Sequence, residues 1–406
     1  MKKKLISFGY KESIVNTCEE KNIEIINLID DFEPKDFLPN TKQNELRIYT
    51  KNNANDFFTI TNFLKSKVPH VDGVIAPFEF TVFNASVFAT FFDCAVLSMP
   101  IALNFRDKIV QKETLENVIH TPRFYCNYEG KVFEKNDFPL IVKPVDGTGT
   151  SLTYKVNDIS ELEHSIKEIT EYGAEYSGYV IEEFIEGQEF YVDGWVTDGE
   201  VQLFMISEYV ENLINIYTGS IVQGVNLVYQ ENQTLYQKVG VFLGKVLKKL
   251  NLENGVFHLE FFLNPDQELV FGECAARLGG VMPETAFLHH WKVDLTSVWI
   301  DICLGEKPKY QLQEKWIDEH TGFTFIPSPK DLNIRDTQFP DLKTLQKELN
   351  FVVNIEYDWY PGDDIPNDRS STANKIGKVF VTGSSKESVQ TNLKKVTNYF
   401  RRLYNE

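Results

Sequence analysis

The stretch from Gly255 to Ala275 constrains the fold of this chain most, because a short polar break separates two strand-like runs. The break is Asn264-Pro-Asp-Gln267, and alternating residues flank it on both sides. This pattern predicts two antiparallel strands joined by a turn. We therefore expect an antiparallel sheet to which this hairpin contributes two neighbouring strands.

The hairpin brings two carboxylates together if its register follows the turn. The simplest register pairs Leu263 with Glu268. Because side chains alternate between the two faces of a strand, His258, Glu260 and Glu273 then share one face. Glu260 and Glu273 become diagonal neighbours whose Cβ atoms are about 7 Å apart or less. A shift of one residue in the register would separate them.

Two carboxylates this close among Phe and Leu side chains are costly unless a cation lies between them. A hard dication with oxygen ligands fits, and Mg²⁺ commonly shares such a site with nucleotide phosphates. The alternative is a pair of solvated charges on an edge strand. The hairpin alone therefore suggests, without deciding, a site for Mg²⁺ and a nucleotide.

The bulk composition is that of a soluble protein. The chain has 406 residues, of which 42% are hydrophobic and 25% charged, which predicts two or three domains. Its net charge of −18 argues against a nucleic-acid or membrane-surface partner, although a local basic cluster could still bind ATP. Five cysteines without metal or CxxC spacing suit the reducing cytoplasm. We see neither a signal peptide nor a membrane-spanning run.

The N-terminal part predicts an α/β domain that ends near residue 103. Strands alternate there with helices, which implies a parallel sheet covered on both faces. Asn104 could cap a helix that runs to Ile119. The expected strands span residues 4–10, 23–28 and 71–76, and the expected helices 13–21 and 84–92.

The remainder predicts an α+β arrangement that is richer in strands. Ser160 could cap a helix over 161–171, and an amphipathic helix over 235–250 precedes the carboxylate hairpin. Further helices are expected at 295–304 and 387–403. The expected strands span 139–144, 152–156, 179–185, 189–196, 322–326, 352–357 and 377–382.

A glycine-rich loop lies between two of these strands. Glycine lets a backbone approach phosphate closely, and hydroxyl groups add donors. Strand rather than helix follows, so the loop is neither a P-loop nor a dinucleotide fingerprint. Lys143 lies beside it among apolar neighbours, where an anion is a natural partner and a structural salt bridge is the alternative. The loop comprises Asp146, Gly147, Thr148, Gly149, Thr150 and Ser151.

Other charged residues are ordinary when taken alone. Lys108 stands at a predicted helix start, where a lysine is usually solvated. The side chains of Glu182 and Glu183 point to opposite sides of a strand, so only one can face a site. Glu189 follows a turn at Gly187 and could accept hydrogen bonds from a ribose, although solvent exposure is more common.

The order of these motifs resembles the ATP-grasp superfamily. The resemblance covers roughly residues 1–305, with 306–406 plausible as a C-terminal subdomain. It implies an N-terminal α/β domain over 1–103 and an ATP-grasp core over 104–305, with a lid at about 123–190 and a metal-binding hairpin at 255–280. The motifs are Arg106-Asp-Lys108, Thr121-Pro122, Val142-Lys-Pro144, Asp146–Ser151, Val180–Glu189, His258-Leu-Glu260 and Glu273–Gly280.

The resemblance implies a role for each matching position. Lys108 and Lys143 match lysines that contact ATP phosphates, and the loop from Asp146 to Ser151 matches the flap that closes over them. Glu189 matches the ribose acceptor. Glu260 and Glu273 match the ligands of Mg²⁺, with Mn²⁺ as an alternative metal. The hinge strand that reads adenine is matched by Glu182, Glu183, Phe184 and Ile185.

The segment from Glu273 to Gly280 looks most like the L-amino acid ligases. Many ATP-grasp members carry Asn at the position of Ala275, and in this narrower group Ala-Ala-Arg replaces that pattern. Arg277 matches the arginine that holds the transferring phosphate, as its planar charged fork allows. The alternative for Arg277 is a structural ion pair with Glu273. Gly279 and Gly280 match a backbone turn near the substrate, and Val281 falls in the amino-acid pocket.

The resemblance therefore implies a cytoplasmic, Mg²⁺/ATP-dependent carboxylate–amine ligase that forms ADP. It would join an amino acid to an amine through an acyl phosphate, with a dipeptide or peptide-like product, and it allows a homodimer. His258 is a candidate base for the amine. The alternatives are a carboxylase or nucleotide-pathway ligase of the same fold, and a non-catalytic nucleotide-binding protein.

An acidic and aromatic segment, 357–368, joins two predicted strands of the C-terminal subdomain. In the superfamily this subdomain packs near the active-site cleft. Asp363 and Asp364 could receive a cationic substrate side chain by ion pairing, and the aromatic residues could add cation–π contact. A solvated acidic loop is the alternative.

Overall fold

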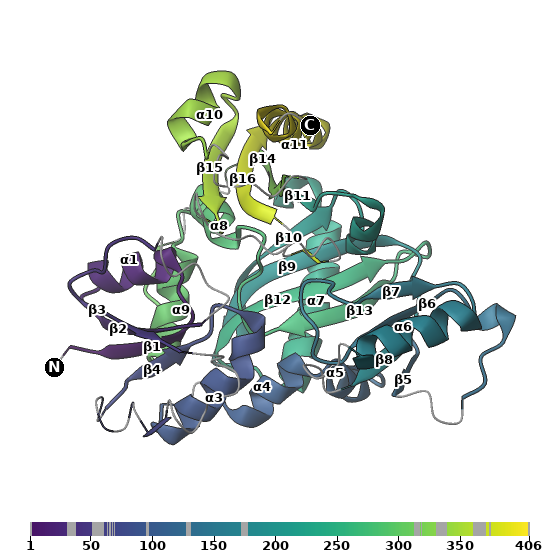
Figure 1. Ribbon diagram of the computed structural model, residues 1–406, viewed down its shortest axis with the longest axis horizontal. Coiled ribbons are helices and arrows are strands. Elements are labelled where there is room, and N and C mark those ends of the chain that lie inside the picture. Colours follow the sequence, from purple (N-terminus) through teal and green to yellow (C-terminus); the bar gives the residue numbers. More distant parts are fainter. Residues whose placement is uncertain are drawn as a thin grey trace.

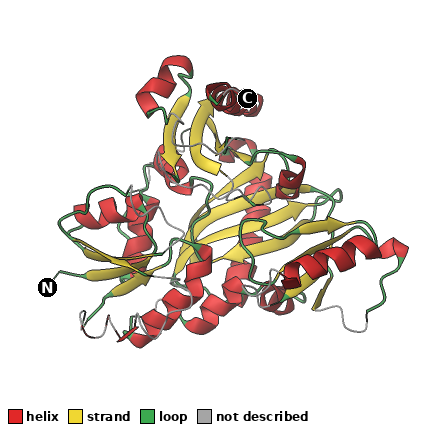
Figure 2. Cartoon of the chain, viewed as in Figure 1, coloured by secondary structure: helices red, strands yellow, loops and turns green. Residues whose placement is uncertain are grey.

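A computed structural model describes most of the chain, and its three sheets are shown in Figures 1 and 2. None of the described helices is long and apolar enough to cross a membrane. The described residues are 2–30, 38–50, 70–94, 97–126, 131–171, 178–311, 319–329, 339–359, 371–372 and 375–404, with 61, 62, 64, 66, 68 and 317.

The N-terminal sheet is parallel, as predicted, with the strand order β3-β2-β1-β4. Apolar residues of its strands are buried beneath the helices, which explains the short apolar runs in the sequence. The strands are β1 (Lys4–Phe8), β2 (Glu24–Ile29), β3 (Glu45–Tyr49) and β4 (Gly73–Ile75), and the helices are α1 (Glu12–Glu20) and α3 (Val82–Phe91), with the short turn η1 (Glu79–Thr81).

The helix predicted to start at Asn104 is wrong, because two helices meet there. α4 spans Met99–Arg106 and α5 spans Lys108–Leu115. Asp107 between them is extended, and its carboxylate accepts hydrogen bonds from the backbone N–H of Ile109 and Val110, 2.8 and 3.0 Å away. Asp107 is thus the cap of α5. The predicted domain boundary at residue 103 falls inside α4, and the division into domains stays a prediction.

A second, antiparallel sheet with the order β5-β8-β6-β7 carries the glycine-rich loop between β6 and β7. Its helix packs on one face and buries a small apolar core. Ser160 lies inside this helix rather than at its cap. The elements are β5 (Phe124–Cys126), β6 (Leu140–Pro144), β7 (Tyr154–Val156), β8 (Tyr179–Glu183), η2 (Lys135–Asp137) and α6 (Ile159–Glu171).

The third sheet has eight strands in the order β13-β12-β9-β10-β11-β14-β16-β15, and its pairs are antiparallel. The carboxylate hairpin, β12 with β13, is therefore at one end of the largest sheet. The strands are β9 (Gln188–Thr197), β10 (Glu200–Tyr209), β11 (Gln223–Asn226), β12 (Gly255–Leu263), β13 (Leu269–Ala275), β14 (His320–Pro327), β15 (Val352–Tyr357) and β16 (Lys375–Gly383).

Helices cover this sheet in separate groups. α7 (Gln233–Lys249) packs its apolar side against β9 and β12, where Phe190, Val192, Phe257 and Leu259 are buried. The intervening residues of both strands face the other way and are partly polar, which leaves a polar surface opposite α7. The remaining elements are α8 (Pro283–Trp291), α9 (Leu295–Cys303), α10 (Leu342–Glu348), α11 (Lys386–Leu403), η3 (Leu213–Thr218) and η4 (Tyr229–Glu231).

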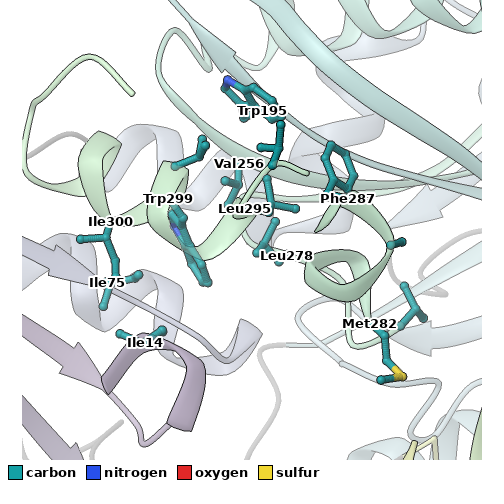
Figure 3. Packing of buried hydrophobic residues seen from close by; sticks show 14 of the residues in the cluster. Ile14, Ile75, Trp195, Val256, Leu278, Met282, Phe287, Leu295, Trp299 and Ile300 are labelled. Carbon is teal, nitrogen blue, oxygen red and sulfur yellow. The ribbon is translucent and has the colours of Figure 1, made fainter. Parts of the chain in front are cut away.

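One apolar cluster joins the N-terminal sheet to the large sheet (Figure 3). Ile14 of α1 and Ile75 of β4 belong to it with Trp299 of α9, and Trp195 of β9 is fully buried in the same cluster. Burying side chains of this size stabilises the fold by roughly 1.5–3 kcal/mol each. The N-terminal sheet is therefore packed firmly against the sheet that carries the hairpin.

Candidate functional site

The register of the hairpin differs from the prediction, yet the two carboxylates meet. Leu263 pairs with Leu269, not with Glu268, and this shift alone would turn Glu273 away from Glu260. A β-bulge after Phe271 leaves Gly272 unpaired, and Glu260 then pairs directly with Glu273. A Cβ on Gly272 would lie 2.8 Å from the carbonyl oxygen of Glu260, so only glycine fits there without a shift.

The two carboxylates have different neighbours. The Tyr209 hydroxyl donates to Glu260 Oε1 at 3.0 Å, and His258 Nε2 lies 3.5 Å from the same oxygen. Lys108 Nζ lies 3.3 Å from Glu273 Oε2. Burial would raise the pKa of Glu273, but Lys108 and Lys143 outweigh it and hold the pKa below its usual range. Glu273 is therefore ionised at neutral pH.

The two carboxylates fit a hard dication whose remaining ligands would not be side chains of this hairpin. Glu260 and Glu273 supply carboxylate oxygens on one face, and their side chains keep 15% and 30% of their exposure. Across the residues that the structure describes, no three His, Cys, Asp or Glu side chains form a metal-binding group. Two carboxylates plus phosphate and water oxygens are a common arrangement for Mg²⁺.

His258 is fixed between two acids. Its Nδ1 lies 3.0 Å from Asp193 Oδ1, which also accepts a hydrogen bond from the Gly279 N–H at 2.8 Å. Burial would lower the pKa of His258, but Asp193 and Glu260 outweigh it and raise the pKa to about 10. Since Asp193 and Glu260 each lie beside one of its two ring nitrogens, the geometry favours a positioning role, and a base role stays a prediction.

Lys108 connects the carboxylates to the glycine-rich loop. It is buried, contrary to the expectation for a lysine at a helix start, and its Nζ donates to the Gly147 carbonyl at 2.7 Å. The neighbouring Arg106 donates to the carbonyl of Asp146. The loop from Asp146 to Ser151 therefore lies directly beside Glu273, close enough for one cation to touch both.

Two distant segments hold the tip of the loop. The hydroxyl of Tyr217 in η3 donates to the Thr150 carbonyl at 2.5 Å and accepts from the Thr153 N–H at 2.9 Å. Thr372 N–H and the Ser371 hydroxyl donate to the Gly149 carbonyl at 2.9 and 3.2 Å. Gly149 adopts a φ of +57°, which favours glycine. The loop is thus held by hydrogen bonds from outside its own sheet.

A cavity of about 1070 Å³ lies beside the loop. Tyr217, Ser371 and Thr372 contribute to its wall, together with residues of β14 and α11. None of the predicted site residues is part of its described lining. The cavity therefore adjoins the loop but not the carboxylates.

A third lysine, Lys112, accompanies Lys143. Glu182 Oε1 lies 3.1 Å from Lys112 Nζ, and Glu182 Oε2 lies 3.2 Å from Lys143 Nζ. Burial would raise the pKa of Glu182, but the two lysines outweigh it and lower the pKa. Burial would lower the pKa of Lys143, but Glu182 and Glu273 raise it above its usual value. All three groups are therefore charged at neutral pH.

The rest of the predicted hinge faces elsewhere. Glu183 points away from Glu182 and lies 2.8 Å from Arg123 Nε at the surface. Phe184 carries Lys155 Nζ over its ring at 3.7 Å, and Ile185 is half-buried. Of these four residues, only Glu182 belongs to the lysine cluster.

Glu189 is buried rather than solvated. Its Oε2 accepts a hydrogen bond from the Leu213 N–H at 2.7 Å. Burial and then the nearby Glu260 raise the pKa of Glu189 to about 8. Glu189 and Glu260 occupy one face of neighbouring strands, so the predicted ribose acceptor and metal ligand lie on a common surface.

Arg277 pairs with Glu79, not with Glu273. Its Nη2 donates to the Glu79 carboxylate and its Nη1 to the Leu278 carbonyl at 2.8 Å. Arg106 Nη1 donates to the other oxygen of Glu79 at 2.7 Å. The buried Nε of Arg277 has no hydrogen-bond partner within the described part of the chain, so one donor is free for an anion.

The two glycines after Arg277 differ in their surroundings. A Cβ on Gly279 would lie 2.5 Å from His258 Nδ1, so a side chain there would displace the imidazole. A Cβ on Gly280 would have no described heavy atom within 4 Å. Val281 is buried in the cluster that joins the two sheets. Close packing against His258 therefore requires glycine at position 279, whereas position 280 faces open space.

The acidic segment expected to receive a cationic substrate is only partly described. Asp363 and Asp364 lie outside the described residues. Asp358 is already engaged, because Lys375 Nζ and Lys378 Nζ lie 3.1 and 3.5 Å from its carboxylate. Asp358 is therefore a structural partner of lysines in this structure.

Sequence reasoning missed four residues that complete this cluster. Asp193 interrupts an apolar strand, and Lys112 follows Lys108 by one helical turn, so each carried a usable signal. Glu79 and Tyr209 carried none, since only the tertiary fold brings them to Arg277 and Glu260.

Residues 136–284 match the ATP-grasp domain family. The chain carries an ATP-grasp domain. The L-arginine-specific L-amino acid ligase of Bacillus subtilis is 23% identical over 314 residues, which are 75% of this chain and 74% of that protein. The ATP-grasp match includes β6 to β13, and so it includes the flap loop, Lys143 and both carboxylates.

Solved structures confirm the ATP-grasp fold over the whole chain. L-amino acid ligase from Bacillus licheniformis superimposes with a TM-score of 0.75 at 18% identity, covering 100% of this chain and 97% of that one. Carboxyaminoimidazole ribonucleotide synthase from Aspergillus clavatus, complexed with ATP, gives 0.73 at 16% identity, covering 99% of each chain. The predicted fold class is therefore confirmed.

Proposed function

We propose that the chain is a Mg²⁺/ATP-dependent ligase that joins the carboxylate of an amino acid to an amine and releases ADP and phosphate. One observation carries this proposal. Lys108 Nζ lies 2.7 Å from the Gly147 carbonyl of the flap loop and 3.3 Å from Glu273. The flap, a candidate phosphate-binding cation and a candidate metal carboxylate therefore meet at a single atom.

In the proposed reaction a substrate carboxylate oxygen attacks the γ-phosphorus of ATP, and ADP leaves. The amine then attacks the carbon of the acyl phosphate, loses a proton, and phosphate leaves with the C–O bond electrons. A dication on Glu260 and Glu273 would offset negative charge on the phosphates. Catalysis of this kind depends mainly on positioning and electrostatic stabilisation.

The residues of this chain have separable tasks in that scheme. Lys108 and Lys143 would bind phosphate oxygens, and Glu182 and Glu189 would lie at the base and ribose end. Arg277 would present its free Nε to the transferring group. His258, held by Asp193, would keep Glu260 and the Gly279 turn in place.

We propose that L-amino acids are the substrates and that the product is a dipeptide or peptide-like. The resemblance of the segment around Arg277 to L-amino acid ligases supports this, as does the named activity of the Bacillus subtilis relative. A cytoplasmic location and a homodimer remain predictions of the sequence. The described residues around Asp358 carry as many lysines as acids, which gives no support to a cationic substrate.

The test is ADP release over pairs of the twenty amino acids, with the products identified by mass spectrometry. ADP and phosphate should appear only with a productive pair, in equal amounts to the new amide. AMP and pyrophosphate as the stoichiometric products would overturn the acyl phosphate route. ATP turnover that requires bicarbonate or a ribonucleotide instead would favour a carboxylase or nucleotide-pathway ligase. ATP binding without turnover under any of these conditions would favour a non-catalytic nucleotide-binding protein.

A further inference from the structure

Lys112 is a fully buried lysine that touches two sheets at once. Its side chain is 0% exposed, and its Nζ donates to the carbonyl of Gly272 at 3.0 Å. The same Nζ lies 3.1 Å from Glu182 Oε1 and 5.6 Å from the centre of the Phe271 ring. Gly272 is the bulge residue of the carboxylate hairpin, and Glu182 belongs to β8 of the smaller antiparallel sheet.

A space-filling role does not explain a charge at this position. A lysine is rarely buried unless it is paired, because removing its ammonium from water is costly. Burial lowers the pKa of Lys112 to about 8 even with Glu182 beside it. Methionine has a similar length and would fill the same space without this cost. We therefore expect the positive charge of Lys112 to have a role at this site that an apolar side chain could not replace.

The charges around Glu182 suggest what that is. Glu182 alone would neutralise Lys143, because the two ions lie 3.2 Å apart. Lys112 shares the same carboxylate, so the three groups carry a net charge of about +1 rather than zero. Lys143 keeps 14% of its side chain exposed, whereas Lys112 is enclosed. The surplus positive charge is thus presented to the site through Lys143.

The position of Lys112 also fixes the spacing of the two sheets. On one side it contacts the carbonyl that precedes Glu273, and on the other it contacts Glu182 of β8, a neighbour of β6 in the smaller sheet. Lys108, one turn earlier on α5, contacts Glu273 and the flap itself. The two lysines therefore each connect the hairpin to the smaller sheet, one helical turn apart on α5.

We propose that Lys112 is a positioning residue for nucleotide binding. Lys112 holds Glu182 against the hairpin bulge and leaves Lys143 with surplus positive charge for a phosphate of the nucleotide. This inference rests on the proposed function, since it assigns a further residue to the same site. Lys112 would not touch the nucleotide. Its removal should therefore weaken ATP binding without changing the response to the amino acid.

The experiment compares Lys112→Gln and Lys112→Met with the wild type by calorimetric binding of a non-hydrolysable ATP analogue in the presence of Mg²⁺. Gln keeps a hydrogen-bond donor without the charge, so it should fold even if Met does not. We expect at least a tenfold increase in Kd for each folded variant, and an unchanged KM for the amino acid. Glu182→Gln combined with Lys112→Gln should weaken binding by less than the product of the single effects, because both act through one contact.

Lys378→Met is the matched control. Lys378 is another largely enclosed lysine with two acidic partners, at 3.5 Å from Glu356 and 3.5 Å from Asp358, and it lies outside the proposed site. The Lys378→Met substitution should lower the melting temperature and leave the Kd for the ATP analogue unchanged. Lys112→Gln with wild-type affinity for the analogue would overturn the inference and leave the proposed function standing. A wild type that does not bind the analogue would overturn both.

Discussion

Arg277 donates to the carboxylate of Glu79, and this contact ties the segment after the carboxylate hairpin to η1, which follows the N-terminal strand β4. Burial would raise the pKa of Glu79, but Arg277 and Arg106 outweigh it and hold the pKa at about 2. The acid is therefore ionised throughout the neutral range. Glu79 and the Leu278 carbonyl hold the two terminal nitrogens of Arg277, and among the described residues its buried Nε has no hydrogen-bond partner.

Glu79→Gln should lower kcat at least tenfold, which is about 1.4 kcal/mol, because Arg277 loses its charged partner and its fixed orientation. The KM for ATP should change little. The variant should also melt at a lower temperature, since two buried guanidinium groups lose a counter-charge. Steady-state kinetics well below the melting temperature separate the two effects. Glu306→Gln, at an exposed ion pair with Lys3, is the control, and an unchanged kcat in Glu79→Gln would contradict the expected role.

Glu260→Gln and Glu273→Gln should each remove most turnover while the protein stays folded. Each variant loses one charged oxygen ligand of the proposed dication. Glu273→Gln should also melt at a somewhat lower temperature than the wild type, because the buried Lys108 loses its acidic partner. Rates measured over a Mg²⁺ or Mn²⁺ titration, together with melting temperatures, check this expectation. Near-normal rates in both variants at saturating Mg²⁺ would show that the hairpin is structural.

Gly272→Ala should damage the site without touching a charged group. The added Cβ would meet the Glu260 carbonyl at 2.8 Å, so the bulge must shift and Glu273 must move with it. We expect a stability loss of about 1–3 kcal/mol, measured by denaturant unfolding, and a higher Mg²⁺ requirement. Gly280→Ala is the stability control, because its Cβ would meet no heavy atom of the described residues within 4 Å. Equal stabilities for the two variants would argue against the bulge geometry.

Tyr217→Phe should loosen the flap. It removes the hydroxyl that contacts Thr150 and Thr153, while the ring remains to pack near Tyr154. Amide hydrogen exchange over residues 147–151 should become faster in the variant, and it should slow in the wild type when an ATP analogue and Mg²⁺ bind. Tyr229→Phe provides a control tyrosine remote from the loop contacts. If neither the nucleotide nor the substitution changes the rate of amide exchange, the loop is only a turn.

Asp358→Asn should reduce the dependence of stability on acid pH. Burial would raise the pKa of Asp358, but Lys375 and Lys378 outweigh it and lower the pKa to about 2. A depressed pKa stabilises the folded state above the unfolded pKa, and that contribution disappears as the pH falls toward about 2. The stability of the wild type should therefore exceed that of the variant most above about pH 5, and the difference should shrink below about pH 4 and vanish toward about pH 2. Melting curves at several pH values check this, and a constant difference would contradict it.

Elements with strong local patterns were predictable from the sequence. Three of the parallel N-terminal strands (β1, β2 and β4), α7, the hairpin and α11 follow from apolar periodicity, whereas β3 was missed. β10, β11 and α8 did not stand out in the sequence, since tertiary contacts decide their structure. The break between α4 and α5 depends on a single capping aspartate, Asp107, inside a stretch that otherwise reads as one helix.

The site was predictable as a set of residues but not as a geometry. The pairing of Glu260 with Glu273 depends on two one-residue register shifts, which together restore the common face, and neither shift has a pattern of its own in the sequence. Burial of Lys108 and Lys112 depends on how α5 packs between two sheets. Contacts between residues that are far apart in the chain, such as that between Glu79 and Arg277, require the fold itself.

The contact between the flap and residues 371–372 has a consequence for biosynthesis. Ser371 and Gly149 are 222 residues apart, and a chain is made from its N-terminal end. The flap strands therefore emerge from the ribosome long before the segment that holds the flap in place. In a growing chain the lysines and carboxylates can come together first. The contacts that hold the flap over a nucleotide can form fully only after residue 372 has been added.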